Sequence, residues 1–396
     1  MSETALRHVE HLAVTIGPRG SATAKEAEAH DYCQATLEGL GYEVHRDSFF
    51  APTSGWHAYA LAEGLMLAAT AIFWLFGRGQ DAQAGALAAA ALGLITTVAF
   101  LLHTSHRPNP LESFVPAERS QNVWAVSPAS AQARQRVVFT GHVDTATAAL
   151  AMQSPALWQL FKVLTLLAGL ANVALVGVFI WGIFTPDALP RTVALVLAIL
   201  PLIGLVFTVQ PSFAPYVAGA NDNATGAAAV LAFAERLKAN PLPNTTVFLV
   251  NTGSEEVGGV GLADWIQRHA VLAANARYLV LDNIGGKGSP VNYVVDETLL
   301  LPVKATPSLV TLAEAVASHH PEMGAKPFHY RGLFSELSIA IVQGQQALGL
   351  LNFDPITKMP PNFHTSRDNM SNVDPAVLER SEQFAWAILE EIDKQG

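Results

Sequence analysis

A histidine and an aspartate follow an apolar segment early in the chain, where they could bind or orient a metal ion. Residues 137–140 form an apolar segment that predicts a strand, and His142 and Asp144 come directly after it. The neutral imidazole of His142 can bind a metal, and Asp144, two residues further along an extended chain, points the same way. Asp144 can therefore hold the ring tautomer or support a neighbouring ligand. Alone, this pair is a weak signal.

The second motif is a glycine-bounded turn. The run from Gly219 to Gly226, Gly-Ala-Asn-Asp-Asn-Ala-Thr-Gly, places Asp222 immediately before an apolar helical pattern. The Asp222 carboxylate can point across the edge of a sheet as a metal ligand. The alternative is that Asp222 caps the N-terminus of its own helix, which is a common structural role for such an aspartate.

Two adjacent glutamates, Glu255 and Glu256, follow the apolar segment 246–251. Adjacent carboxylates repel each other, so a pair beside a cleft usually requires a cation or a shared proton. With a metal present, one glutamate can be a ligand while its neighbour acts as general base. The alternative is a solvated acidic loop.

Two further candidates complete a ligand set. Asp282 ends the apolar segment 278–282, and His364 lies in a polar loop after a proline-rich stretch. The candidate ligands are then two imidazoles and three carboxylates: His142, Asp222, Glu256, Asp282 and His364. Nitrogen and oxygen ligands suit a catalytic zinc pair rather than a structural zinc. The single cysteine, Cys33, excludes a thiolate zinc site and an internal disulfide, and we expect it in the core.

Strands alternate with helices around these motifs. The strand-like segments are 42–49, 122–126, 137–140, 246–251 and 278–282, and the helical ones are 25–40, 226–237, 307–318 and 375–394. This alternation predicts an α/β fold, a three-layer α/β/α sandwich with a mixed, largely parallel sheet. Ligands of such sheets bind beyond the carboxyl ends of the strands, which is where the polar motifs fall.

Four apolar runs interrupt this pattern, at about residues 58–77, 82–102, 157–184 and 192–209. Each meets or approaches the roughly 20 apolar residues that a membrane-spanning helix needs. Short links at 77–83 and 185–191 join the runs into two transmembrane helical hairpins, residues 56–103 and 157–210, which give four transmembrane helices. The alternative is four buried core helices, but core helices rarely lack a polar stripe over such a length.

The segments outside the hairpins, residues 1–52, 113–150 and 212–396, form one discontinuous domain in this interpretation. They must then lie on one side of the membrane. Residues 1–10 carry charges and no apolar run, so we expect no signal peptide and a multi-pass integral membrane protein whose large domain is cytoplasmic. The arginines and lysines near the runs barely discriminate between the two sides. Glu63 and Lys162 lie within or beside the runs, and we expect both at the interface with water, Lys162 by snorkelling.

The motifs together resemble the co-catalytic di-zinc aminopeptidase family, which also contains glutamate carboxypeptidases and glutaminyl cyclases. The H-x-D, G-A-x-D-N-A-T-G, E-E-x-G, strand-end L-D and H-T-x-x-D motifs occur in the order of that family. The opening segment from Ile16 to Ser21 also resembles it. The resemblance covers nearly all of the chain outside the apolar runs.

The resemblance implies a role for each residue. Asp222 would bridge two zinc ions, and its peptide bond to Asn223 would be cis. One zinc would be held by His142 and Asp282, and the other by Glu256 and His364. Glu255 would take a proton from the water that bridges the metals and deliver it to the leaving amine, with Asp144 supporting the ligands.

The chain departs from the family pattern in three places. Asn221 replaces an aspartate often found there, and the segment 334–337, Phe-Ser-Glu-Leu, lacks a common S-D-H pattern, which leaves the substrate pocket unassigned. About 77 residues, including the second hairpin, separate Asp144 from Asp222. We therefore expect the mouth of the active site to face the bilayer or the hairpins, with membrane-associated or hydrophobic peptides as substrates.

The composition limits the classes of partner. The formal net charge of −10 gives no indication of a nucleic-acid partner. Peptide substrates and the lipid bilayer are the expected partners, with two Zn²⁺ per chain, and the sequence does not indicate an oligomeric state. Three alternatives to an aminopeptidase stay open: a glutaminyl cyclase, a carboxypeptidase or other amidohydrolase, and a membrane scaffold or transporter built on an inactive peptidase.

Overall fold

The computed structural model describes residues 2–105, 107, 109–298 and 302–396, and it separates the chain into two compact units. Unit 1 comprises Met1–Thr53, Ala117–Ala148 and Pro215–Gly396, and unit 2 comprises Ser54–Pro116 and Ala149–Ala214. Each unit has its own hydrophobic core. Cys33 lies in the core of unit 1, as predicted, and burial raises the pKa of its thiol to about 12.

Unit 1 is built on a mixed sheet. Within the described residues the sheet has nine strands in the order β1-β2-β4-β3-β5-β9-β6-β7, and β8 pairs with β6. The strands are β1 (Val44–Pro52), β2 (Ala117–Ser127), β3 (Gln135–His142), β4 (Thr245–Thr252), β5 (Arg277–Asp282), β6 (Asn292–Thr298), β7 (Pro302–Lys304), β8 (Lys326–Arg331) and β9 (Gln346–Leu351).

The parallel part of the sheet is its centre. Neighbours among β4, β3, β5 and β9 are parallel, whereas β1, β2 and β7 pair antiparallel at the two sides. The mixed α/β fold is therefore confirmed, and parallel pairing outside the centre is found between β6 and β8. The register places His142 opposite Thr252 and Asp282 opposite Leu351, so the carboxyl ends of the central strands meet at one edge.

Helices cover the sheet of unit 1. They are α1 (Ser2–Glu10), α2 (Ala24–Gly39), α8 (Thr225–Ala239), α9 (Val260–Arg268), α10 (Pro307–His319), α11 (Glu336–Val342) and α12 (Pro375–Lys394), with short helical turns at η1 (His11–Ile16), η6 (Ala220–Ala224), η7 (Pro321–Met323) and η8 (Met370–Asn372). The chain passes from β3 through α8 to β4, and then back over β3 through α9 to β5. Because parallel crossovers are right-handed, these opposite directions put α8 and α9 on opposite faces.

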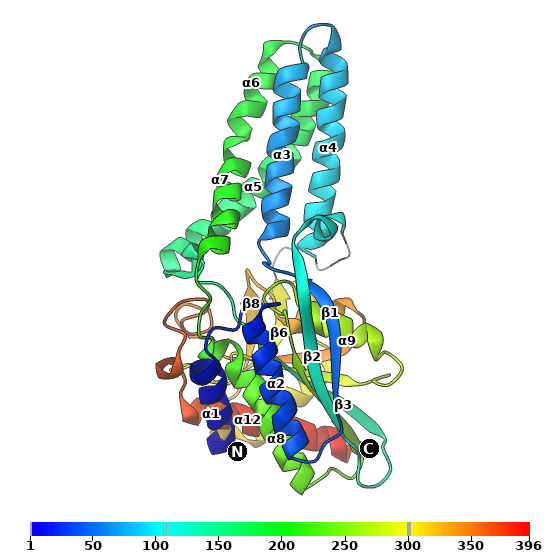
Figure 1. The fold of residues 1–396 in the computed structure, drawn as a ribbon, viewed down its shortest axis with the longest axis vertical. Coiled ribbons are helices and arrows are strands. Elements are labelled where there is room, and N and C mark those ends of the chain that lie inside the picture. The colour runs from blue at the N-terminus through cyan, green and yellow to red at the C-terminus, as the bar shows by residue number, and fades with distance from the viewer. Residues whose placement is uncertain (1, 106, 108, 299–301) are drawn as a thin grey trace. The chain divides into compact units, whose positions relative to one another are not determined.

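Unit 2 consists of long apolar helices that run side by side (Figure 1). They are α3 (His57–Phe76), α4 (Ala82–His103), α5 (Pro155–Phe184), α6 (Ala188–Leu197) and α7 (Ile199–Val209), with turns at η2 (Gly79–Asp81), η3 (Pro110–Phe114), η4 (Leu150–Met152) and η5 (Gln210–Phe213). Four helical segments in the described part are long and apolar enough to cross a membrane. The fourth run, expected as one helix, divides at Ala198 because Pro201 has no N–H to continue the ladder.

The sequence prediction for Glu63 was wrong. Its side chain is not at an interface with water but is only 3% exposed, and it accepts a hydrogen bond from Asn172 of α5. Its position on α3 points the carboxyl group between helices instead of outward. Lys162 is half-buried and lies over the Trp158 ring, with Nζ 5.7 Å from the ring centroid.

The chain leaves and re-enters unit 1 through paired segments. At the first interruption Pro52 of β1 pairs with Ala117 of β2. At the second, the Ala148 amide donates to the Pro215 carbonyl at 2.9 Å, and the Val217 amide donates to the Ala146 carbonyl at 2.9 Å. The sheet pairing of unit 1 therefore continues up to the last residues before each interruption.

Candidate metal centre

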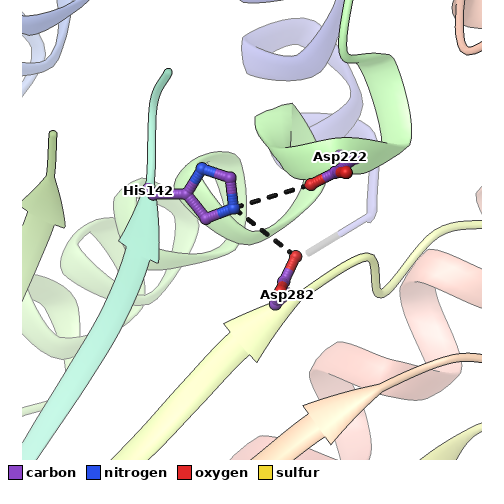
Figure 2. A group of neighbouring side chains, drawn as sticks. All are labelled: His142, Asp222 and Asp282. Carbon is purple, nitrogen blue, oxygen red and sulfur yellow. Dashed lines mark ion pairs between the residues drawn. The ribbon is translucent and has the colours of Figure 1, made fainter. Parts of the chain in front are cut away.

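Three of the predicted ligands meet at the carboxyl edge of the sheet (Figure 2). His142 ends β3, Asp282 ends β5, and Asp222 comes from the turn before α8. His142 Nε2 lies 3.6 Å from Asp222 Oδ1 and 3.6 Å from Asp282 Oδ1. These distances are too long for hydrogen bonds, but they suit ligands that each lie about 2.1 Å from one ion.

A second group forms on the other oxygen of Asp222. His364 Nε2 lies 3.2 Å from Asp222 Oδ2 and 3.1 Å from Glu256 Oε2. The structure therefore brings all five predicted ligands into two groups, His142–Asp222–Asp282 and Asp222–Glu256–His364. Within each group the ligand atoms lie within 4.8 Å of one another, and Asp222 belongs to both.

The turn around Asp222 is held from outside its helix. Asp368 accepts hydrogen bonds from the backbone N–H groups of Asn221 and Asp222, at 2.9 and 3.0 Å. The peptide bond between Asp222 and Asn223 is cis, as the family resemblance implies. Ala224 occupies the N-cap position of α8 without a side-chain hydrogen bond, so the alternative role of Asp222 as a helix cap is wrong.

Asp144 organises the glutamate pair. It is fully buried, and its two oxygens accept hydrogen bonds from the backbone N–H groups of Glu255 and Glu256, at 3.0 and 3.1 Å. The Ser21 hydroxyl donates to the same carboxylate at 2.6 Å. His142 Nδ1 lies 3.4 Å from Asp144 Oδ1, so one aspartate contacts both the ring and the loop that carries the glutamates. Although burial opposes ionisation, these contacts lower the pKa of Asp144.

Glu255 and Glu256 point to different places. Glu256 contacts His364, whereas Glu255 Oε2 lies 3.9 Å from His142 Nε2 and makes a third group with His142 and Glu256. Burial raises the pKa of Glu255 well above its usual range. Burial also raises the pKa of Glu256 to about 7, against the opposing effect of His364. Glu255 is therefore buried and Glu256 is partly buried, and the alternative of a solvated acidic loop is wrong.

The charges of the cluster favour a cation at its centre. Burial favours neutral imidazole rings, yet the neighbouring carboxylates raise the pKa of His142 well above 6.5 and that of His364 to about 10. His142 Nε2 and Glu256 Oε1 are buried atoms without a hydrogen-bond partner among the described residues. Buried polar atoms are almost always paired, so unpaired nitrogen and oxygen atoms that face carboxylates fit bound zinc.

Sequence reasoning missed Glu26, which is fully buried at the start of α2. Its Oε1 accepts hydrogen bonds from Ser254 N at 2.8 Å and Ser254 Oγ at 3.1 Å, and its Oε2 accepts one from Ser120 Oγ at 2.9 Å. Ser254 has a φ of 54°, a left-handed conformation that a non-glycine residue rarely adopts. Glu26 thus stabilises the backbone immediately before Glu255.

The segment that departs from the family pattern also lies near the site. Glu336, at the start of α11, is buried and accepts a hydrogen bond from Thr140, two residues before His142 on β3. Burial raises the pKa of Glu336 to about 7, and His142 opposes that rise. The segment 334–337 therefore supplies a carboxyl group to the base of the site.

The sequence model of peptidase family M28 matches residues 205–389, which include Asp222, Glu255, Glu256, Asp282 and His364. The chain therefore contains a domain of peptidase family M28, in agreement with the resemblance to the di-zinc aminopeptidases. The chain is a zinc-dependent, aminopeptidase-like hydrolase, and the ligand set described above fits the zinc of the M28 family. No curated protein matches it in sequence.

Solved structures share the fold of this chain. A glutaminyl cyclase of Bacteroides thetaiotaomicron is 14% identical, with a TM-score of 0.58 over 98% of this chain and 97% of that one. A leucine aminopeptidase precursor from the same organism is 13% identical, with a TM-score of 0.57 over 98% and 96%. The zinc aminopeptidase BSAP of Bacillus subtilis is 15% identical, with a TM-score of 0.57 over 98% and 95%. At such low identity the likeness shows the fold.

Zinc affinity is expected to rise with pH. Glu256 must be ionised and His364 neutral to bind zinc, whereas without metal their pKa values are about 7 and about 10. Zinc must then displace protons, so its affinity increases about tenfold per pH unit for each proton released. Competition with a chelating dye between about pH 6 and pH 8 measures this slope. A zinc affinity that does not change with pH would contradict this prediction. The control is His329→Ala: His329 is exposed and paired with Asp296, so its removal should leave the slope of zinc affinity against pH unchanged.

Removing the Glu26 carboxylate should slow catalysis without emptying the zinc site. In Glu26→Leu, Ser254 loses its acceptor and the loop that carries Glu255 relaxes, so kcat should fall about 10- to 100-fold. KM and zinc content should change little, and Glu26→Gln, which keeps one acceptor oxygen, should recover part of the loss. Glu28→Leu, at an exposed position of the same helix, is the control. If Glu26→Leu lost zinc in proportion to its loss of activity, Glu26 would have a structural role only, and the prediction would be wrong.

Proposed function

We propose that this chain is a membrane-integrated di-zinc aminopeptidase that removes N-terminal residues from peptides. The observation that carries the proposal is the pair of ligand groups that share Asp222, with Glu255 beside them. In this proposal His142, Asp222 and Asp282 hold one zinc, and Asp222, Glu256 and His364 hold the other. Zinc, when bound, supplies a Lewis acid that polarises the scissile carbonyl and lowers the pKa of water.

Glu255 is the proton carrier in this mechanism. Its carboxylate lies beside His142, and it is the one member of the glutamate pair that does not contact His364. Glu255 Oε2 takes a proton from the attacking water and passes it to the leaving amine. Asp144 fixes the backbone N–H groups of both glutamates, and Glu26 fixes the residue before them, so the carboxylate is positioned before substrate binds.

The surface of unit 2 supports membrane insertion. Large apolar side chains along its helices are more than half exposed, among them Leu87, Leu94, Ile95, Leu166, Leu170, Val196 and Val206. A soluble protein rarely exposes apolar surface of this extent. We propose that unit 2 spans the bilayer as two hairpins and that unit 1 is the peptidase domain on one side. Such a peptidase is anchored where membrane-associated and hydrophobic peptides are most concentrated.

A glutaminyl cyclase is the alternative function, because some solved structures with this fold are glutaminyl cyclases. The two complete ligand groups favour hydrolysis with two metals. Zinc content per chain and the chemistry of the product distinguish the two functions.

The function is tested with the full-length protein purified in detergent and supplied with zinc. It should release the first residue of peptides with a free N-terminus and leave N-acetylated peptides and C-terminal residues intact. Glu255→Gln should retain two zinc ions but lose about 100- to 10,000-fold in kcat, the usual effect of removing a general base. Glu235→Gln, an exposed glutamate on α8, is the matched control.

Other product patterns would overturn the assignment. Release of C-terminal residues would indicate a carboxypeptidase, and conversion of N-terminal glutamine to pyroglutamate with one zinc per chain would indicate a cyclase. Full hydrolysis by Glu255→Gln would refute the role of that carboxylate.

Membrane insertion is tested separately by extraction of membranes that contain the full-length chain. Helices in the bilayer resist alkaline carbonate and high salt, which remove peripheral proteins, and are released by detergent. We expect the protein in the pellet after carbonate treatment and in the supernatant after detergent. Release by carbonate would contradict insertion while leaving the peptidase assignment intact.

A further inference from the structure

A buried polar contact joins two apolar helices of unit 2. Glu63 of α3 is 3% exposed, and Asn172 of α5 is 1% exposed. Asn172 Nδ2 donates a hydrogen bond to Glu63 Oε2 at 3.4 Å, which is long for this type of bond. The contact joins the first hairpin, which contains α3, to the second, which contains α5.

A third helix, α7, has a glycine where it meets the carboxyl group of Glu63. Gly204 lies on α7, and a Cβ added there would lie 3.2 Å from the Glu63 carboxyl carbon and 3.3 Å from Oε1. The glycine therefore allows the carboxyl group to lie against the backbone of α7. Three helices enclose Glu63 in this way.

The described part of the bundle provides no counter-charge for an ionised Glu63. The basic groups on α3 and on the elements that pack against it are engaged elsewhere: His57 with Ser212, His103 with Glu112, Lys162 over Trp158, and Arg191 with the Gly77 carbonyl. Tyr59 of α3 packs against the rings of Phe100 and His103. Among the described residues no cation pairs with Glu63. A buried carboxylate with one long hydrogen bond and no cation is costly, most of all inside a membrane.

The amide oxygen of Asn172 indicates how the cost of burying a charged carboxylate is avoided. Asn172 Oδ1 is buried and has no hydrogen-bond partner among the described residues. It is an acceptor that needs a donor, and an ionised carboxylate has none to offer. A protonated carboxyl group has one, so adding a proton to Glu63 satisfies the unpaired oxygen.

We propose that Glu63 binds a proton in the folded bundle and forms a neutral acid–amide pair with Asn172. The Asn172 amide donates to one oxygen of Glu63, and the Glu63 O–H donates to Asn172 Oδ1. The pair is a proton-binding site that stabilises the packing of the two hairpins against each other, and loss of the proton weakens that packing. This inference depends on the packing of unit 2 and does not depend on peptidase activity.

The probe is dicyclohexylcarbodiimide, an apolar reagent that reacts with protonated carboxyl groups in apolar surroundings. The Glu63 oxygen adds to the central carbon of the reagent while the proton moves to a reagent nitrogen. The acyl group then migrates to nitrogen, which leaves a stable adduct of carboxyl group and reagent with no atom lost. Mass spectrometry of the full-length protein in membranes, after digestion, locates the adduct.

We expect labelling of Glu63 that falls about tenfold for each pH unit above its midpoint, as the protonated fraction falls. Asn172→Asp should move the midpoint to higher pH, because two close carboxyl groups cannot both ionise and one proton is retained. Asn240→Asp, at an exposed position in unit 1, should leave the midpoint unchanged. Glu63→Gln should abolish the adduct at this position.

An infrared difference spectrum gives a second measurement that does not depend on the Asn172 variant. The spectrum of the unlabelled protein minus that of Glu63→Gln should contain the C=O band of a protonated carboxylic acid. Three results would overturn the proposal. The first is a carboxylate band at neutral pH in place of the carboxylic acid band. The second is absence of the adduct at Glu63 in protein that still binds zinc and is therefore folded, and the third is saturable protection of Glu63 from the reagent by sodium or potassium ions. The last would assign the site to a metal cation.

Discussion

The guanidinium group of Arg19 holds together the three chain segments on which the metal ligands depend. It is fully buried and donates hydrogen bonds to the carbonyls of Leu12, Gly17, Val143, Ala218 and Gly219, at 2.7 to 3.0 Å. Val143 lies between His142 and Asp144, and Gly219 opens the turn that carries Asp222. Burial lowers the pKa of Arg19 to about 10, with Asp368 and Asp144 opposing the change, so the side chain stays charged at neutral pH. It offsets part of the negative charge that the site collects.

Three carboxylates that are not themselves ligands hold the backbone around the centre. Asp368 binds the backbone of Asp222, Asp144 binds that of Glu256, and Glu26 binds the residue before Glu255. Carboxylates that accept backbone N–H groups keep the loops rigid while directing the ligand oxygens to the centre. The result is a buried cluster with more acids than bases, which favours bound cations or retained protons.

The sequence predicted the parts of this site that are local in the chain. His142, Glu256 and Asp282 follow apolar strands and Asp222 precedes a helix, so their place at the carboxyl edge follows from the alternation of elements, and the mixed α/β fold follows in the same way. His364 was found from its polar loop alone. Glu26 was missed because its partner Ser254 is 228 positions away, and nothing in its own helix distinguishes it from a surface acid. Glu63 was misplaced because hydropathy does not reveal which face of an apolar helix meets a neighbour. The division at Ala198 depends on Pro201, a local signal that the apolar pattern concealed.

The paired segments at the two interruptions of unit 1 mean that each insertion begins and ends at neighbouring residues of that unit. Ala148 and Pro215 are hydrogen-bonded neighbours, and Pro52 and Ala117 are partners in the strand register, so each pair of ends is already at the spacing of a tight turn. Closing such a gap with a few residues costs little loop entropy, and insertions at such points are the ones that folds tolerate. Exchange of each hairpin for a short turn would alter no strand that carries a ligand. By the same reasoning, a peptidase of this fold can acquire an anchor without first rebuilding its catalytic site.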